Sequence, residues 1–361
     1  MSHAQRQPGD FQSLPVIDIS GLFSQQKGER QAVAEQLGDA ARNVGFFHVV
    51  GHGIGEETRR GLLDQARRFF AQPMEAKMRH YIGLSAGNGT TRHRGYVPEG
   101  EEVPEKGKRD LKEAFDLSFE LPADDPEVIA GTPMMGPNVW PDLPGFRDPV
   151  QGYYRAAYAV GRTLMRGFAL ALGLPEAHFL AHVTKPPSQL RLIHYPYDPD
   201  AEDAQGIGAH TDYECFTLLL PTAPGLEVMN GSGEWIDVPY RDDALVINIG
   251  DMLEIWTNGE FVATSHRVRK VKQERYSFPL FFACDYATTV APLPRFVERD
   301  GEAHYAPLEA GDHLYAQTIH TFAYLQQRLA TGEIHLPDGA RDAATLGQHA
   351  RHHPQADRET P

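Results

Sequence analysis

Cysteine is scarce in this sequence, and long apolar runs are missing. Its 361 residues include two cysteines, Cys215 and Cys284, which cannot form a disulfide framework and lack the clustered spacing of a thiolate metal site. We expect both to be buried and reduced. No stretch approaches the length that spans a bilayer, and the polar start "MSHAQRQPGDFQSLP" lacks the apolar core of a signal peptide. These features predict a cytoplasmic protein without a membrane partner.

Positive charge is also in deficit. The chain carries 34 Lys and Arg against 49 Asp and Glu, a formal net charge of −15. This balance opposes a general attraction to phosphate backbones, so we expect no nucleic-acid partner. The hydrophobic content of 41% is sufficient to bury a substantial core. The sequence therefore predicts a globular protein, and it makes no prediction of its oligomeric state.

The patterning of apolar residues divides the chain into successive segments. Strand-like runs alternate with amphipathic helices at first, one long apolar helix follows, and short β-rich runs separated by turn signals come next. A single last helix is predicted over 312–330. We expect a disordered N-terminus over 1–13, an α/β region over 14–145 with a flexible flap over 83–110, a central helix within 146–185, a β core over 186–290, a C-terminal helical region over 291–335 and a polar tail over 336–361.

One histidine and one aspartate stand two positions apart at the head of the strand-like run "GIGAHTDYECFTLLL". They are His210 and Asp212. Residues i and i+2 of a strand point to the same face, so the two side chains should converge. Composition alone predicts roughly two His-x-acid pairs in a chain of this kind, so the pair is weak evidence by itself. Its meaning depends on further residues.

His266 supplies the third ligand of a candidate metal site. It lies on another predicted strand of the β-rich region, after the Asn258-Gly259 turn. Two imidazoles and one carboxylate leave coordination positions open, an arrangement associated with non-haem Fe(II) that binds a cosubstrate and O₂. Zinc held by the same three ligands would activate water instead, so a zinc hydrolase remains an alternative.

Arg275 and Ser277 form a candidate anion site nine residues beyond His266. They too are two apart, and the apolar run "FPLFF" follows them, so the strand is too apolar to be a surface strand on both faces. A guanidinium binds a carboxylate through two parallel hydrogen bonds, and a neighbouring hydroxyl can donate a third. The pair therefore indicates a clamp for a carboxylate or dicarboxylate.

These residues, in this order, resemble the isopenicillin N synthase-like family of Fe(II) and 2-oxoglutarate-dependent oxygenases. The resemblance extends from about residue 14 to 285 and includes the blocks "LPVIDIS", "GFFHVVGHGI", "RLIHYPYDP", "GLEVMNGSGEWIDVP", "VINIGDMLEIWTNG" and "RYSFPLFF". It implies a mixed α/β fold with a double-stranded β-helix, or jelly-roll, core flanked by helices. It also implies that the catalytic iron is held by His210, Asp212 and His266, and that 2-oxoglutarate is held by Arg275, Ser277 and Tyr195.

The implied reaction uses Fe(II), 2-oxoglutarate and O₂. 2-Oxoglutarate is decarboxylated to succinate and CO₂ while a small-molecule substrate is oxidised. "YPYDP" is closer to isopenicillin N synthase itself, which uses no 2-oxoglutarate, and Ile193-His194 replaces the Asn-Tyr of many relatives. A 2-oxoglutarate-independent oxidase or oxidative cyclase is therefore an alternative, and a jelly-roll binding module without catalysis is another.

Candidate substrate residues come from two places in the chain. The flap motif "TRHRGY" lies in a region that contacts substrate in relatives, and aromatic residues of the β core could form an apolar wall. The candidates are Arg92, Arg94, Tyr96, Phe216, Trp256 and Phe282.

Overall fold

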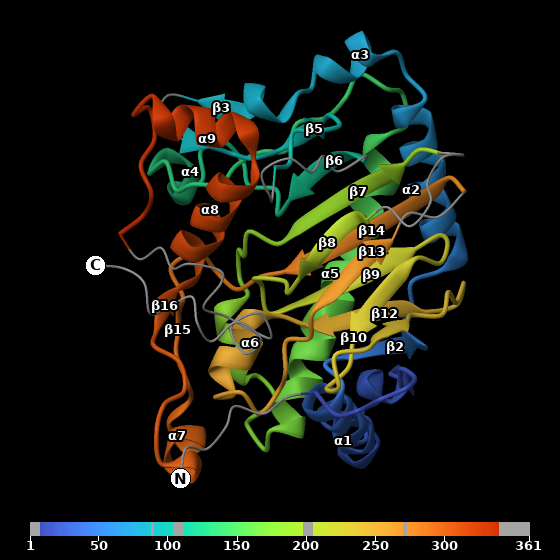
Figure 1. The fold of residues 1–361 in the computed structure, drawn as a ribbon, viewed down its shortest axis with the longest axis vertical. Helices are drawn as coiled ribbons and strands as arrows, with labels where there is room; N and C mark the ends of the chain where they lie inside the picture. Colours follow the sequence, from blue (N-terminus) through green and yellow to red (C-terminus); the bar gives the residue numbers. More distant parts are fainter. Residues whose placement is uncertain (1–7, 88–89, 104–111, 198–204, 270–272, 339–361) are drawn as a thin grey trace.

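Two β-sheets and a set of flanking helices make up the molecule (Figure 1). The computed structural model describes residues 8–87, 90–103, 112–197, 205–269 and 273–338. The larger sheet has eight strands in the order β1-β2-β12-β9-β14-β7-β6-β5. Their bounds are β1 Val16–Asp18, β2 Phe46–Val50, β5 Gly95–Val97, β6 Glu113–Ser118, β7 Gln189–Tyr195, β9 Phe216–Pro221, β12 Leu245–Ile249 and β14 Arg275–Phe282.

The smaller sheet has four antiparallel strands in the order β11-β10-β13-β8. They are β8 Gln205–His210, β10 Leu226–Met229, β11 Trp235–Asp237 and β13 His266–Arg269. β10 and β11 form a hairpin across the "NGSG" turn, one of the turn signals that separate the β-rich runs. Together the two sheets form the jelly-roll core of a mixed α/β fold, as the resemblance implied.

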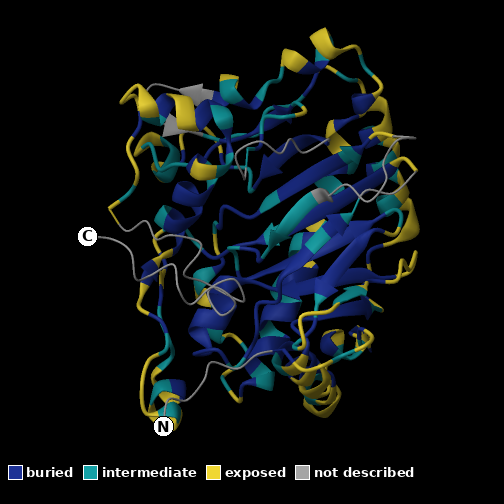
Figure 2. Cartoon of the chain, in the orientation of Figure 1, coloured by how far each residue is buried: buried dark blue, intermediate teal, exposed yellow. Residues whose placement is uncertain are grey.

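Helices cover the outer face of the larger sheet. α5 (Arg147–Ala171) packs on β14 so closely that a Cβ at Gly161 would collide with the ring of Phe282. α1 (Lys27–Asn43) and α2 (Glu56–Phe70) pack against α5. In Figure 2 the strands of this sheet are almost wholly buried, while the outer sides of α1 and α2 are exposed. Among the described helices, none is both long and apolar enough to cross a membrane.

Both cysteines are buried and unbridged, as expected.

Most of the remaining elements are short. The short helices are α3 Met74–Met78, α4 Pro126–Ile129, α6 Asp251–Trp256, α7 Pro294–Asp300, η1 Ser20–Phe23, η2 Ile82–Ser85 and η3 His178–His182. The short strands form two pairs, β3 Ala86–Gly87 with β4 Thr90–Thr91, and β15 Thr289–Val290 with β16 Leu308–Glu309.

The strands of the larger sheet have an outer and an interior face. On the outer face the rings of Phe216 and Phe282 stack at 4.8 Å, and Phe168 of α5 lies 5.3 Å from Phe216. Because side chains alternate along a strand, the odd-numbered residues of β7, β9 and β14 point to the opposite, interior face. That face looks into the jelly roll and carries the candidate site.

Two segments that the sequence leaves disordered or flexible make regular backbone contacts. In the N-terminal segment expected to be disordered, the Gly9 amide donates to the Asn43 carbonyl at 2.5 Å and the Gly9 carbonyl accepts from Gly231 at 3.0 Å. Residues 1–7 lie outside the described part. The flap is more regular than expected, because β5 within it is an edge strand of the large sheet. Flap residues 88–89 and 104–111 and tail residues 339–361 lie outside the described part.

The last helix is interrupted. α8 (Ala310–Thr321) and α9 (Ala323–Ala330) are separated by Phe322, whose φ of −102° and ψ of 127° are extended. The backbone on either side of Phe322 bonds to the flap instead, because the Val103 amide donates to Thr321 and the Ala323 amide donates to Glu101. These tertiary hydrogen bonds override a helical periodicity that is continuous in the sequence.

Candidate metal centre and cosubstrate site

Two histidines face each other across neighbouring strands of the smaller sheet. His210 is the last residue of β8 and His266 the first of β13, and the antiparallel register pairs them directly. Their ring centroids lie 4.2 Å apart. The ring of Phe46, from β2 of the larger sheet, lies 5.1 Å from that of His266. The pair therefore lies between the two sheets, at one end of the jelly-roll interior.

Asp212 completes a three-residue cluster. Its Oδ1 lies 3.6 Å from Nε2 of His210 and 3.6 Å from Nε2 of His266. One ligand atom from each residue lies within 4.8 Å of the other two, a spacing suited to a single metal ion. The side chain of His210 is 35% exposed, against 10% or less for the other two, so the cluster is open on the His210 side.

Each histidine ring is oriented by a backbone carbonyl. Nδ1 of His210 lies 2.8 Å from the Gly208 carbonyl, so the ring donates there and leaves its Nε2 free to bind a metal. Nδ1 of His266 makes a longer contact of 3.4 Å with the Thr264 carbonyl. Both rings therefore direct Nε2 toward Asp212.

Two residues hold the carboxylate of Asp212. Its Oδ2 accepts hydrogen bonds from the Thr217 hydroxyl at 2.5 Å and from the Asn248 side-chain amide at 2.7 Å. Both bonds go to Oδ2, so Oδ1 remains available to a metal. Neither residue was among the sequence candidates. The one sequence signal is that Asn248 is a polar residue inside the apolar strand β12.

The protonation states suit a metal site. Burial and the neighbouring charge of His210 lower the pKa of His266 to about 4, so its ring is neutral at neutral pH. Burial alone would raise the pKa of Asp212, but His266, His210 and the two hydrogen bonds hold it below its ordinary value. A neutral imidazole and an ionised carboxylate are the forms that bind metals.

A buried cation without an anion lies elsewhere on the interior face. Arg275, the first residue of β14, is 1% exposed, and neither Nη1 nor Nη2 has a hydrogen-bond partner among the described residues. Its Nε makes one long contact, 3.4 Å, with the Ala223 carbonyl. Burial lowers the pKa of Arg275, and the neighbouring Tyr195 only partly opposes that shift. An unpaired buried guanidinium is costly, so this side chain fits a carboxylate ligand that brings both charge and acceptors.

Tyr195 and Ser277 are brought to the same place. Tyr195 is paired with Arg275 in register, and the guanidinium carbon lies 4.9 Å from the tyrosine ring centroid. Ser277 is 3% exposed and lies two residues from Arg275 on the same face, next to Ile193 and Pro221 on the neighbouring strands. The three residues predicted to hold a cosubstrate therefore share one end of the interior face.

The two arginines of the flap motif contact other parts of the protein. Arg94 is fully buried, and its guanidinium donates to the Asn138 side chain and to the carbonyls of Arg92, Met134 and Phe119. These bonds occupy the N–H groups of Arg94 that would otherwise be available to a substrate. The side chain of Arg92 packs near Gly136.

Tyr96 is directed to the outer face of the sheet. It is fully buried, its ring lies 5.9 Å from Phe69 of α2, and its hydroxyl donates to Glu113 at 2.6 Å. The interpretation of the flap motif as substrate-binding is therefore not supported for Arg94 or Tyr96.

The aromatic candidates are also corrected. Phe216 and Phe282 stack on the outer face against α5, and Trp256 packs against Phe179 at 5.1 Å and His182 at 5.6 Å. For Phe216 and Phe282 the physical reason is the period of two of a strand, since a shift of one residue moves a side chain to the other face, whereas Trp256 is the last residue of the helix α6. Phe281, the neighbour of Phe282, pairs with Thr217 and shares its interior face.

Protein-family models match most of the chain. Residues 14–143 match the model described as "non-haem dioxygenase in morphine synthesis N-terminal", and residues 186–283 match the 2OG-Fe(II) oxygenase superfamily. A homoarginine-6-hydroxylase from Oryza sativa subsp. japonica is 35% identical over 87% of this chain and 98% of its own length. A 2-oxoglutarate-dependent dioxygenase, tropC, from Talaromyces stipitatus is 33% identical over 85% of this chain and 95% of its own.

Solved structures agree. A putative 2OG-Fe(II) oxygenase family protein from Caulobacter crescentus has a TM-score of 0.73 and 30% identity, over 89% of this chain and 99% of that one. A full-length protein from Neurospora crassa, solved in complex with alpha-KG, has a TM-score of 0.71 at 24% identity, over 88% of this chain and 96% of that one, which is a likeness of fold.

The relatives decide between the alternatives that the sequence left open. They are named as 2-oxoglutarate-dependent enzymes, so the zinc hydrolase, the non-catalytic binding module and the oxidase without 2-oxoglutarate are set aside. With matched models, relatives above 30% identity and a shared fold, the chain belongs to the 2OG-Fe(II) oxygenase superfamily and is an Fe(II)- and 2-oxoglutarate-dependent dioxygenase.

Proposed function

We propose that His210, Asp212 and His266 bind the Fe(II), and that Arg275, Ser277 and Tyr195 bind 2-oxoglutarate. The observation that carries this assignment is the pair of unpartnered nitrogens of the buried Arg275. They lie on the interior face of the same jelly roll whose interior holds the His-Asp-His cluster. A dicarboxylate can meet the guanidinium with one end and reach toward the iron with the other.

The side chains of the site would act mainly by positioning. Fe(II), with 2-oxoglutarate and O₂, supplies the oxidising power when bound. Asp212 would contribute the single anionic ligand through Oδ1, because Thr217 and Asn248 occupy Oδ2. Arg275 and Ser277 would fix the distal carboxylate of 2-oxoglutarate, with Tyr195 beside them. The residues around Arg275 are buried, which would keep water away from the carboxylate bound there, whereas the cluster stays open on the His210 side.

The substrate is a small molecule in this proposal. Relatives are named for action on homoarginine, and the Neurospora crassa protein has also been solved with thymine, so the family accommodates chemically different compounds. The cytoplasmic location expected from the sequence stays a prediction.

Anaerobic reconstitution tests the assignment. Fe(II) and then 2-oxoglutarate are added to metal-free protein, and the visible charge-transfer band of the Fe(II)–2-oxoglutarate complex is recorded. We expect the band in the wild-type protein, no iron binding in Asp212→Ala, and bound iron with a weakened band in Arg275→Ala. Equal loss of iron in the two variants would contradict the division of roles.

A further inference from the structure

Two neighbouring residues on the interior face of the larger sheet, close to the metal cluster, are partly exposed. On β14 the exposure pattern is buried throughout except at Phe281, and on the interior face of β7 it is buried except at Gln189. Phe281 pairs with Thr217 on one side and with Gln189 on the other. Since Thr217 holds Asp212, this row of three side chains runs from the metal ligand to the partly exposed Gln189.

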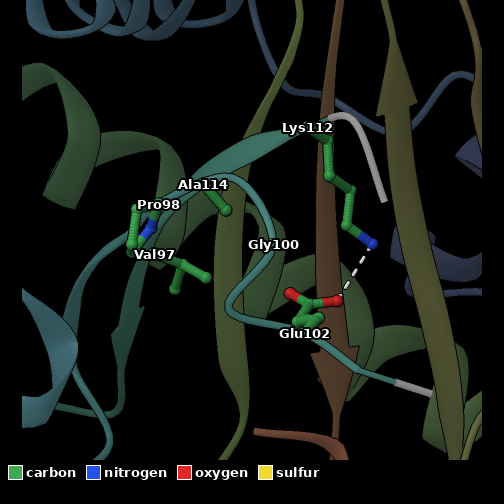
Figure 3. Close-up of a pocket in the computed structure, with 6 residues that line it drawn as sticks. All are labelled: Val97, Pro98, Gly100, Glu102, Lys112 and Ala114. Carbon is green, nitrogen blue, oxygen red and sulfur yellow. Dashed lines mark ion pairs between the residues drawn. The ribbon is translucent and has the colours of Figure 1, made fainter. Parts of the chain in front are cut away.

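Arg191 lies on the same face, two residues from Gln189, and its charge is already balanced. Asp116 accepts two hydrogen bonds from its guanidinium at 2.8 and 2.7 Å, and Glu102 accepts a third at 2.6 Å. Glu102 also pairs with Lys112 at 2.9 Å, on the wall of a small pocket that Val97 and other residues line (Figure 3). Two buried cations thus meet two buried carboxylates, and the charge of Arg191 is not available to a substrate anion.

Phe322 covers the guanidinium of Arg191. The guanidinium carbon lies 5.4 Å from the ring centroid of Phe322, and the ring of His93 lies 4.4 Å from it edge-on. Phe322 is 4% exposed. It occupies the break between α8 and α9, and Figure 1 shows these helices beside the segment that carries β3 to β5.

Glu102 contacts both Phe322 and Arg191. Its backbone forms a bridge with Phe322, and the same residue's carboxylate holds Arg191 and Lys112. Hydrogen bonds from Val103 to Thr321 and from Ala323 to Glu101 flank the bridge. The position of the Phe322 ring beside Arg191 is therefore set by one residue of the flap.

We propose that Phe281, Gln189 and Phe322 contact the substrate, and that it is a flat molecule whose hydrogen-bonding groups are uncharged. This inference rests on the proposed function. Two aromatic rings favour a flat, largely apolar body, and the Gln189 amide offers both a donor and an acceptor. Among the described residues, Arg191 is already paired with Asp116 and Glu102, and Arg275 is assigned to the cosubstrate, so neither cation is left to pair with a substrate carboxylate. A charged substrate group would add net charge beside the buried ion pairs of Arg191 and Lys112 with Asp116 and Glu102, which is unfavourable.

Calorimetric titration tests the substrate class. The protein is loaded anaerobically with Mn(II) and 2-oxoglutarate, and two sets of probes are compared. One set is neutral and flat (thymine, indole, 2-quinolone), and the other is charged and flexible (L-homoarginine, L-lysine). We expect a neutral flat probe to bind most tightly. Binding of charged probes alone, or of no neutral flat probe, would overturn the proposal.

Matched variants test the residues. Gln189→Ala and Phe322→Ala should each weaken the best neutral probe by about tenfold, while Phe322→Tyr keeps most of the affinity. The outer-face variant Phe282→Leu should leave probe affinity unchanged. Equal effects of Phe282→Leu and Phe322→Ala would overturn the assignment. The visible Fe(II)–2-oxoglutarate band, recorded for every variant, separates this failure from failure of the proposed function, because only the latter removes the band from the wild-type protein.

Glu102 is assigned a positioning role, which has its own readout. Glu102→Gln should speed hydrogen exchange of the backbone amides of 321–324 and weaken the neutral probe, with 2-oxoglutarate affinity unchanged. Unaltered exchange at these amides would show that Glu102 does not fasten Phe322.

Discussion

The two ends of the jelly-roll interior differ in how complete they are without ligands. At the metal end, His210, Asp212 and His266 lie within bonding range of one ion, and their remaining polar atoms bond to the protein. At the other end, Arg275 presents two buried nitrogens without a hydrogen-bond partner in the described chain. The metal end is organised in advance, whereas the anchor end, the surroundings of Arg275, would be completed by the carboxylate of the proposed function.

This difference predicts how each end responds to substitution. Removing a group from the organised end disrupts a network whose members hold one another. Removing Arg275 takes away a buried charge that destabilises the folded protein as long as no anion is bound to it. Substitutions at the two ends should therefore differ in their effects on iron binding, on 2-oxoglutarate binding and on the stability of the metal-free protein.

The largest effect is expected at Asp212. Asp212→Ala removes the single anionic ligand and leaves Thr217 and Asn248 without their acceptor, so iron binding should be abolished. Metal analysis of protein reconstituted with Fe(II) under anaerobic conditions measures this. Arg275→Ala, which alters the other end and should keep its iron, serves as the control. Stoichiometric iron binding by Asp212→Ala would contradict the distinction between the metal end and the anchor end.

Arg275 should show the second largest effect. Arg275→Leu is expected to weaken 2-oxoglutarate by about 3 kcal/mol, or roughly a hundredfold, because a charge-assisted clamp is lost. The same variant should raise the free energy of unfolding of the ligand-free protein, because a buried unpaired cation is removed. Calorimetry and urea unfolding measure the two quantities. A ligand-free variant less stable than wild type would refute the idea of an incomplete anchor end.

A pH effect is expected at His93, in the contact between the flap and the C-terminal helices. Burial and then the charge of Arg191 lower the pKa of His93 to about 3, from 6.5. The unfolded chain takes up this proton and the folded protein does not, so the contribution of His93 to stability is complete above pH 6.5 and declines as the pH falls toward 3. It should be about 2 kcal/mol smaller at roughly pH 5 than at about pH 7.

Urea unfolding at both pH values, in wild type and His93→Gln, isolates this contribution from those of other groups. The variant should lose less stability on acidification than the wild type does. The same loss in both proteins would show that His93 is not held unprotonated. The result extends the comparison to a contact that, like the metal end, is complete without ligand: His93 bonds to the Tyr324 hydroxyl at 2.8 Å.

The smallest effect is expected at Thr217. Thr217→Val keeps the shape of the side chain but removes one of two donors to Oδ2 of Asp212. Iron affinity should fall by about tenfold, as is typical of a partner that orients a ligand. Competition with a chelator measures the change. Affinity equal to wild type would mean that Asn248 alone orients the carboxylate.

Much of the site followed from local pattern. A period of two placed Arg275 with Ser277 on one face of β14, and His210 and Asp212 also come together, although β8 ends at His210 and Asp212 lies beyond the strand. The amphipathic helices near the N-terminus, which are α1 and α2, and the short β-rich runs with turn signals between them, such as β10 and β11, were likewise visible in periodicity and turn residues. These features depend on residues close in sequence, so the sequence alone could predict them.

Features that depend on register between distant strands were missed. Thr217 and Asn248 meet Asp212 because β9 pairs with β12, and no periodicity encodes that pairing. Choosing Phe282 over Phe281 failed because the strand is apolar on both faces, so α5 alone reveals which is outer. The break at Phe322 depends on hydrogen bonds to a flap more than two hundred residues earlier.

The proposed binding of 2-oxoglutarate by the two unpartnered nitrogens of Arg275 would couple the stability of the folded protein to the supply of that metabolite. A ligand that binds the folded chain alone stabilises it by about 2.7 kcal/mol when its concentration is roughly a hundred times its dissociation constant. Proteases cleave chains that open, so the rate of degradation should follow the supply of 2-oxoglutarate. At a low concentration of 2-oxoglutarate, a cell would therefore contain fewer molecules of the enzyme, and each molecule would turn over more slowly.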